Sequence, residues 1–271
     1  MDNAFVPMPA VVEDVITETP TIKTFVLSPE RPISFRAGQF MQLGIPGLGE
    51  APFTPSSSPF VPERMEITIL RTGSVTNALH TLAPGAVVGL RGPFGRGYPV
   101  DHFEGREVLV VGGGVGLAPL RALLFWLFHE IDRVKRVSIK YGSREPAELC
   151  FRRLHEEWGR LPKVDFTCTI DRPAPGWDGR VGLVTTLLDG LDVDVKEAVV
   201  VSCGPEVMLK FVTLKLCDLG FPPEHIFLSM NRNMSCGMGL CGRCNVGPFY
   251  LCKDGPDMCY ADIKDIPYAL G

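Results

Sequence analysis

Four cysteines near the C-terminal end of the chain are the strongest constraint in the sequence. The segment SCGMGLCGRCNVGPFYLC contains Cys236, Cys241, Cys244 and Cys252 in the spacing C-x4-C-x2-C-x7-C. The C-x4-C-x2-C core is typical of plant-type [2Fe-2S] sites, in which a fourth thiolate comes from further along the chain. The spacing therefore predicts a [2Fe-2S] cluster held by these four thiols.

Three glycines lie between the first three cysteines of this segment, at positions 237, 239 and 242. Glycine suits a loop around a compact inorganic core, because its backbone adopts positive φ and can direct N–H groups at sulfur. A structural zinc site is the alternative. Zinc knuckles usually come as paired CxxC units, however, and this segment contains one such unit. The pattern therefore favours an iron-sulfur cluster over zinc.

The other cysteines are dispersed along the chain. Cys150, Cys168 and Cys217 are expected to pack in the core, because free cysteine behaves as a small hydrophobic residue. Cys259 competes with Cys252 as the fourth ligand, although its spacing from the third cysteine would be unusually long. We predict that Cys252 is the ligand.

Composition excludes several classes of function. With 271 residues, 45% of them hydrophobic, the chain can bury a full core in two modest domains. The net charge of -4 gives no broad basic field, so nucleic acid is not an expected partner. The N-terminus lacks a signal-peptide pattern, and the most apolar helical stretch, residues 118–128, is too short to span a bilayer. We therefore expect a cytoplasmic protein without a membrane span, a setting in which clustered cysteines more often bind metal than form disulfides.

The N-terminal part has the pattern of a β-protein. Short apolar runs alternate with turns that carry Pro and Gly, which favours a sandwich or small barrel. The character changes near residues 101–106, so we predict a β-barrel domain over residues 1–102. Its expected strands cover residues 11–19, 21–28, 40–45 and 65–71.

The middle of the chain alternates apolar strands with helices. Continuous apolar strands of this kind indicate a parallel sheet covered on both faces. We predict an α/β domain over residues 103–228, followed by a small cluster-binding lobe over residues 229–271 with little periodic structure. The expected elements are a helix over about 118–131 and strands near 107–113, 134–143, 164–171 and 198–204.

A glycine-rich turn follows the first of these strands. Small residues there let the backbone approach a pyrophosphate, whose charge is favoured by free N–H groups and by the helix dipole. The turn is not a strict GxGxxG motif, because proline stands near the sixth position, and a tight strand-to-helix turn without a ligand is the alternative. The predicted nucleotide contacts are Gly112, Gly113, Gly114, Gly116, Leu117, Ala118 and Pro119.

A second loop, like the glycine-rich turn, directly follows an apolar strand. Cys203, Gly204 and Pro205 follow a later apolar strand. Ligands of open α/β sheets bind at the carboxyl edge of the strands, so we expect both loops to face one crevice.

Together, GGGVGLAPLR, SCGPEVM and CGMGLCGRC resemble the ferredoxin-NADP reductase superfamily. Within it the chain resembles the iron-sulfur branch: the electron-transfer subunit of dihydroorotate dehydrogenase, the gamma subunits of soluble hydrogenases, a subunit of anaerobic sulfite reductase, and the small subunit of NADH-dependent ferredoxin:NADP reductase. The resemblance covers essentially the whole chain. It implies an FAD-binding β-barrel, a nucleotide domain and a [2Fe-2S] lobe. It also implies that Cys203, the one predicted catalytic residue, lies near the flavin and the nicotinamide.

The flavin motif of this superfamily is an Arg-x-Tyr-Ser type segment, and the corresponding run here is APFT, residues 51–54. The arginine, which usually pairs with the FAD pyrophosphate, is missing. Arg71 is the expected compensating cation, in a stretch that resembles the second flavin-contact segment of the superfamily. The FAD contacts implied are Pro52, Phe53, Thr54, Leu70, Arg71, Gly73, Val75 and Thr76.

The resemblance implies an NAD(P)H-dependent oxidoreductase that moves electrons through FAD and a [2Fe-2S] cluster to a partner. Flavin accepts a hydride and releases single electrons, so it connects the two other carriers. The sequence contains no separate substrate domain, so we expect the partner to be a redox subunit of the hydrogenase, sulfite reductase, dihydroorotate dehydrogenase or ferredoxin-linked kind. A stand-alone NAD(P)H:ferredoxin reductase and a zinc-stabilised nucleotide-binding module are the alternatives. Arg144 and Arg172 stand where a 2′-phosphate would be met, which leaves the choice between NADH and NADPH open.

Overall fold

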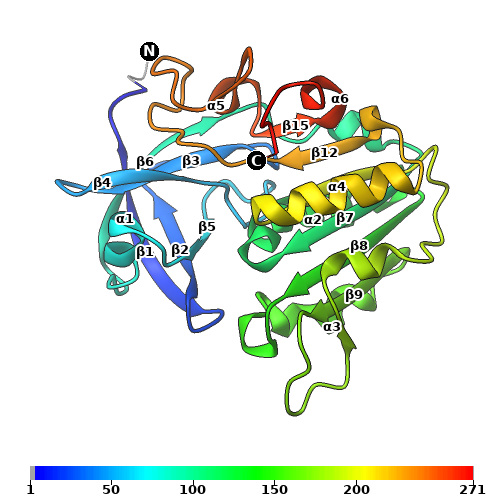
Figure 1. Ribbon diagram of the computed structural model, residues 1–271. Coiled ribbons are helices and arrows are strands. Elements are labelled where there is room, and N and C mark those ends of the chain that lie inside the picture. The colour runs from blue at the N-terminus through cyan, green and yellow to red at the C-terminus, as the bar shows by residue number, and fades with distance from the viewer. Residues whose placement is uncertain (1–3, 271) are drawn as a thin grey trace.

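Two β-sheets that stand next to each other form the framework of the molecule (Figure 1). The computed structural model describes residues 4–270. The first sheet curls so that its edge strands approach each other, which confirms the predicted β-architecture of the N-terminal part. Its strands are antiparallel and lie in the order β4 (Gly49–Phe53), β3 (Phe40–Ile45), β6 (Val87–Phe94), β1 (Met8–Thr17), β2 (Ile22–Pro29) and β5 (Met65–Leu70).

The sequence pattern misses β4 and β6 in this sheet. Both strands contain Gly and Pro, in GEAPF and VVGLRGPF, and these residues resemble turn signals. β4 is an edge strand. A proline such as Pro52 is tolerated there, because the side of the strand that lacks the N–H can face away from the neighbouring strand. The hairpin before it uses Gly47 and Gly49, with φ of 80° and 125°.

The second sheet is parallel except at one edge. β7 and β11 are apolar and buried over nearly their whole length, as expected for strands covered on both faces. This confirms the predicted α/β architecture. The order is β10 (Arg180–Val181), β9 (Val164–Ile170), β8 (Arg136–Ser143), β7 (Glu107–Gly113), β11 (Val199–Cys203), β12 (Ile226–Ser229) and the antiparallel β15 (Asp257–Cys259).

Helices cover both faces of this second sheet. Val108 and Val110 of β7 belong to the same buried core as α2, whereas Leu109 and Val111 belong to the core that contains α4. Because successive strand residues point to opposite faces, α2 and α4 cover opposite sides. The helices are α1 (Ser74–Leu79), α2 (Leu117–His129), α3 (Arg152–Gly159), α4 (Glu206–Asp218), α5 (Leu251–Asp254) and α6 (Tyr260–Ile263), with 3-10 turns at Val100–Phe103, Gly114–Gly116, Ile131–Arg133, Pro146–Glu148, Val184–Leu188 and Pro223–His225.

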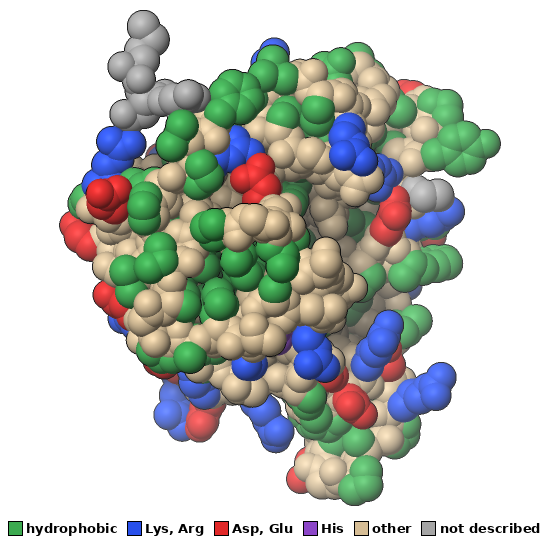
Figure 2. Space-filling view, turned by 90° about the vertical axis from the view of Figure 1, so that its left-hand side faces the viewer, with side chains coloured by type: hydrophobic (Ala, Val, Ile, Leu, Met, Phe, Trp, Pro, Cys, Tyr) green, Lys and Arg blue, Asp and Glu red, His purple; other side chains and the backbone are tan. Residues whose placement is uncertain are grey.

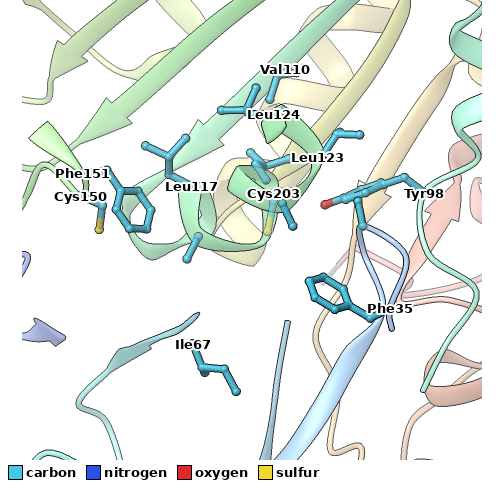
Figure 3. Close-up of a cluster of buried hydrophobic side chains, with 14 of the residues drawn as sticks. Phe35, Ile67, Tyr98, Val110, Leu117, Leu123, Leu124, Cys150, Phe151 and Cys203 are labelled. Carbon is cyan, nitrogen blue, oxygen red and sulfur yellow. The ribbon is translucent and has the colours of Figure 1, made fainter. Parts of the chain in front are cut away.

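The core on the α2 side continues into the first sheet. Figure 3 shows Ile67 and Phe35 on one side of this core, opposite Leu117 and Phe151. The two sheets therefore share one apolar core, which fixes their relative position.

The C-terminal segment is part of the second sheet, which corrects the expectation of little periodic structure after Ser229. β12 ends at this residue, and β15 returns beside it so that Asp257 pairs with Ser229. Residues 230–256 thus form a loop closed at its base, which includes the hairpin of β13 (Asn245–Val246) and β14 (Phe249–Tyr250). β15 also covers the edge that β12 would otherwise leave unpaired.

The surface agrees with the weak net charge. On the face of the first sheet, Figure 2 shows acidic and basic side chains mixed around a group of hydrophobic ones. Over residues 4–270, no helix combines the length and the apolar character needed to cross a bilayer.

Candidate functional site

The loop closed by β12 and β15 brings together the four cysteines predicted as cluster ligands. The thiols of Cys236 and Cys241 interact with each other. The sulfur atoms of Cys244 and Cys252 lie 3.4 Å apart. Charge on Cys236 also raises the pKa of Cys252, so the two thiol pairs lie close together.

Backbone N–H groups point at the sulfurs of this set. The N–H of Met238 lies 3.4 Å from Cys236 Sγ, and the N–H of Gly239 lies 3.0 Å from Cys252 Sγ. Gly237 has a φ of 79° and Gly239 a φ of 72°, in the left-handed region that favours glycine. The glycines therefore turn the backbone so that its donors face the thiols.

The thiols differ in proton affinity. Burial raises the pKa of Cys236, but backbone N–H donors outweigh this effect and lower the pKa to about 6. Burial and the adjacent thiol of Cys244 raise the pKa of Cys252 to about 12. The loop itself therefore favours one thiolate, and the whole set ionises only when a cationic centre offsets the repulsion between the thiolates.

This donor set fits a [2Fe-2S] cluster, in which each iron takes two thiolates. Two adjacent thiol pairs supply these two sets. Among residues 4–270, no three His, Cys, Asp or Glu side chains already surround a single metal-ion position. Cys259 lies apart, with its Sγ 3.8 Å from the carbonyl oxygen of Pro223 and 3.7 Å from that of Glu224. The structure thus places Cys252, and not Cys259, with the other three cysteines.

The glycine-rich turn after β7 packs against the loop after β11. Gly112 and Cys203 are partners in register at the carboxyl ends of these parallel strands. A Cβ atom at Gly116 would lie 2.3 Å from the carbonyl oxygen of Cys203, and one at Gly113 would lie 2.2 Å from Met208 Sδ. The close approach of the two loops therefore requires glycine at position 116, where the obstacle is backbone, whereas at position 113 the flexible Met208 side chain can move aside.

Gly114 faces open space. Its φ is 54°, and no atom lies within 4 Å of the position of a Cβ. α2 begins directly after this turn without a side-chain cap, but the N–H of Leu117 donates to carbonyl oxygens of the turn and Pro119 has no N–H. The open backbone at Gly114 is therefore the part of this turn that an anion such as a phosphate can approach. The other residues predicted for this site lie in the first turn of α2 (Leu117, Ala118 and Pro119) and just before α4 (Gly204 and Pro205).

The two segments predicted to contact a flavin lie on neighbouring elements. β4 contacts α1, and Gly73 is the N-cap of α1. The hydroxyl of Thr76 accepts the N–H of Gly73 at 2.8 Å, so this hydroxyl stabilises the turn. Arg71 follows β5 and is exposed, so its guanidinium is accessible to an anion. Of the remaining predicted contacts, Phe53, Leu70 and Val75 pack partly buried against the core, Pro52 lies in β4 and Thr54 follows it.

Comparisons with known proteins cover the whole chain. Residues 9–98 match the oxidoreductase FAD-binding domain, and residues 110–213 match the oxidoreductase NAD-binding domain. Sulfhydrogenase 1 subunit gamma of Pyrococcus furiosus is 35% identical over 280 residues, which cover 99% of this chain and 96% of that protein. The chain belongs to the ferredoxin-NADP reductase superfamily.

Further members of the superfamily agree with this result. A probable dihydroorotate dehydrogenase B (NAD(+)) electron transfer subunit of Methanocaldococcus jannaschii is 33% identical, over 90% of this chain and 86% of that protein. The solved structure of an NADH-dependent reduced ferredoxin-NADP oxidoreductase has the same fold, with a TM-score of 0.77 over 98% of this chain and 94% of that chain at 23% identity. The protein is therefore an oxidoreductase with an FAD-binding sheet and a nucleotide-binding sheet. The cysteine loop lies beyond both matched ranges.

Cys203 lies beside a polar group at the junction of the two sheets. Figure 3 shows Cys203 and Tyr98 on facing elements. The Tyr98 hydroxyl is 2.9 Å from Ser229 Oγ, and Ser229 donates a hydrogen bond to Asp257. Burial, followed by the charge of Asp257, raises the pKa of Cys203 to about 12. Cys203 is therefore held as a neutral thiol and is no thiolate nucleophile.

Sequence reasoning missed Tyr98, Ser229 and Asp257. They come from a loop and two strands, and Tyr98 and Ser229 are 131 positions apart. The only local signal is an acidic residue in β15, a strand that is otherwise apolar.

Proposed function

We propose that this protein is the electron-transfer subunit of a larger redox complex. It takes a hydride from NAD(P)H and passes single electrons through a [2Fe-2S] cluster on Cys236, Cys241, Cys244 and Cys252 to a partner subunit. The observation that carries this proposal is the two-pair arrangement of thiols in a chain with FAD-binding and NAD-binding domains. Bound FAD would supply the conversion between a hydride and single electrons.

In this proposal, each of the three cofactors is bound by a different part of the chain. Residues 1–102 would bind FAD, residues 103–228 the nucleotide and residues 229–271 the cluster. The glycine-rich turn at Gly114 would hold the pyrophosphate of the nucleotide, with Arg71 as the cation for FAD. Packing of Gly116 on Cys203 keeps the two nucleotide loops in one orientation, and the neutral Cys203 thiol would add no charge beside a bound nicotinamide.

The names of the relatives support a partner subunit that holds the final electron acceptor. Two of them are a sulfhydrogenase subunit and a dihydroorotate dehydrogenase electron transfer subunit. Leu240 is 70% exposed and Cys241 is exposed, so one side of the thiol set lies at the surface, where a partner can approach.

Visible and EPR spectra of the anaerobically purified protein test the proposal. Addition of NADH or NADPH should bleach flavin bands and produce the signal of a reduced [2Fe-2S] cluster. A protein that stays colourless after anaerobic reconstitution with iron, sulfide and FAD would leave the zinc-stabilised module as the function. Copurification with a redox subunit supports the complex, whereas rapid reduction of a soluble ferredoxin by the isolated chain supports the stand-alone reductase.

A further inference from the structure

An ion pair with a buried guanidinium lies where the first sheet meets the cysteine loop. Arg91 is on β6 and Glu50 is on β4. Arg91 Nε lies 2.9 Å from Glu50 Oε2, and a terminal nitrogen of the same guanidinium contacts the other carboxylate oxygen. The side chain of Arg91 is 6% exposed and that of Glu50 is 31% exposed. This two-point geometry fixes the guanidinium in orientation.

The same guanidinium reaches the first cysteine of the cluster loop. Its two terminal nitrogens lie 3.4 and 3.5 Å from the carbonyl oxygen of Cys236. One of them also donates to the carbonyl oxygen of Ala4 at 2.9 Å. A buried, permanently charged cation therefore lies against the backbone of a proposed cluster ligand.

Neighbouring side chains of the first sheet hold this part of the loop. Gln42 on β3 donates a hydrogen bond to the carbonyl oxygen of Met234. The ring of Phe94 fills the space beside Gly237, where a Cβ would come within 2.6 Å of it. The Arg91 guanidinium carbon lies 5.5 Å from the centroid of the same ring. The cation thus has a fixed position relative to the cysteine loop.

We propose that the Arg91–Glu50 pair sets the reduction potential of the cluster. This inference rests on the proposed function, because it requires a cluster on the four thiols. Reduction adds one electron, and thus one negative charge, at the cluster. A nearby buried cation stabilises the reduced form, and a nearby carboxylate opposes it. The electron comes from reduced FAD and leaves to the partner, while Arg91 stays protonated throughout.

Because the two partners carry opposite charges, replacing each one in turn distinguishes an effect on the reduction potential from simple anchoring of the loop. Arg91→Gln removes the positive charge, so the ratio of reduced to oxidised cluster at a fixed solution potential should fall about tenfold, or about 59 mV for one electron. Glu50→Gln removes the negative charge and should raise the same ratio, by about threefold because Glu50 is more exposed and better screened. The double variant should lie between the two single variants.

A redox titration of the full chain, loaded with FAD and cluster and followed by EPR, measures these shifts. Arg96→Gln is the matched control, since Arg96 is 71% exposed and lies 3.5 Å from Asp254 near the cluster loop. Screening by solvent should leave the cluster potential of this variant unchanged. If Arg91→Gln fails to hold a cluster, Arg91→Lys takes its place. It keeps the charge and should stay within about twofold of the wild-type ratio, while Glu50→Gln still shifts upward.

Shifts of opposite sign in the two glutamine variants support the inference, as does an upward shift in Glu50→Gln when Arg91→Lys keeps the wild-type ratio. Shifts of the same sign, or no shift in either variant, overturn it and leave Arg91 as an anchor of the loop. A wild-type protein without a cluster signal would instead contradict the proposed function. The two failures are therefore distinguishable.

Discussion

The hydroxyl groups of Tyr98 and Ser229 lie 2.9 Å apart and join the end of the FAD-binding part to β12 of the nucleotide-binding sheet. Ser229 also donates a hydrogen bond to Asp257. The second carboxyl oxygen of Asp257 lacks a hydrogen-bond partner among residues 4–270. Burial raises the pKa of Asp257 to about 8, although the nearby hydroxyls of Ser229 and Tyr98 act in the opposite direction. Asp257 is therefore mainly protonated at neutral pH.

Asp257→Asn should flatten the pH dependence of stability. An aspartate in the unfolded chain has a pKa of about 3.9. Between that value and about pH 8 the folded state therefore binds more protons than the unfolded state. The stabilisation by protonated Asp257 is complete below about pH 4 and is lost as the pH rises through about 8.

Melting temperatures of the FAD-loaded protein, measured between about pH 5 and pH 9, test this prediction. Asparagine resembles the neutral acid, so the advantage of the variant over wild type should grow with pH, to a few kcal/mol at most. Asp178→Asn, at an exposed position, is the control. Parallel curves for Asp257→Asn and wild type would contradict the prediction.

Cys252→Ser should lose the visible absorption of the cluster, and Cys259→Ser should keep it. Cys252 Sγ lies 3.4 Å from Cys244 Sγ, whereas Cys259 Sγ faces carbonyl oxygens elsewhere. Iron and sulfide content of the two variants, purified side by side without oxygen, measures the difference. Retention of a normal cluster in Cys252→Ser would mean that another residue completes the ligand set.

Gly116→Ala should weaken nucleotide binding and lower stability. The new Cβ would lie 2.3 Å from the backbone carbonyl oxygen of Cys203, so one of the two loops has to move. Overpacking of this kind costs about 1–3 kcal/mol. Gly159→Ala is the matched control, because its Cβ would meet its nearest neighbour at an ordinary 3.8 Å. Melting temperature and the KM for NAD(P)H should change only in the first variant.

Arg144→Ala should reduce the use of NADPH more than that of NADH. The N–H of Asp171 donates to the carbonyl oxygen of Ser143 at 2.9 Å, so the exposed Arg144 and Arg172 follow adjacent strand ends. A 2′-phosphate at this edge would gain a charge-assisted contact, and its loss should lower kcat/KM for NADPH about tenfold. Arg160→Ala, at the exposed C-cap of α3, should change neither rate. Equal losses with both nucleotides would show that Arg144 has another role.

Local patterns in the sequence predict the elements whose burial is uniform. β7 and β11 are recognisable because both of their faces are covered, which makes nearly every position apolar. The cysteine spacing is also informative, because one short loop supplies all four thiols. β4 and β6 escape prediction because Gly and Pro in an edge strand or near a strand end resemble a turn.

Contacts between distant parts of the chain leave no such pattern. Arg91 meets Glu50 across 41 positions and Cys236 across 145. In the sequence Arg91 is a single charge in an apolar run, the same signal that an exposed strand residue gives. Only the packing of the FAD-binding sheet on the cysteine loop shows that this charge is buried.

The pairing of Ser229 with Asp257 has a mechanical consequence for the loop between them. Both ends of residues 230–256 are anchored in neighbouring strands of one rigid sheet, and Arg91 and Gln42 hold the loop from the side. The thiols are thus held in a fixed position relative to the sheet and are not carried on a flexible segment. In the proposed function, the acceptor has to travel to the cluster, and the rate of electron delivery depends on how often and how closely it docks.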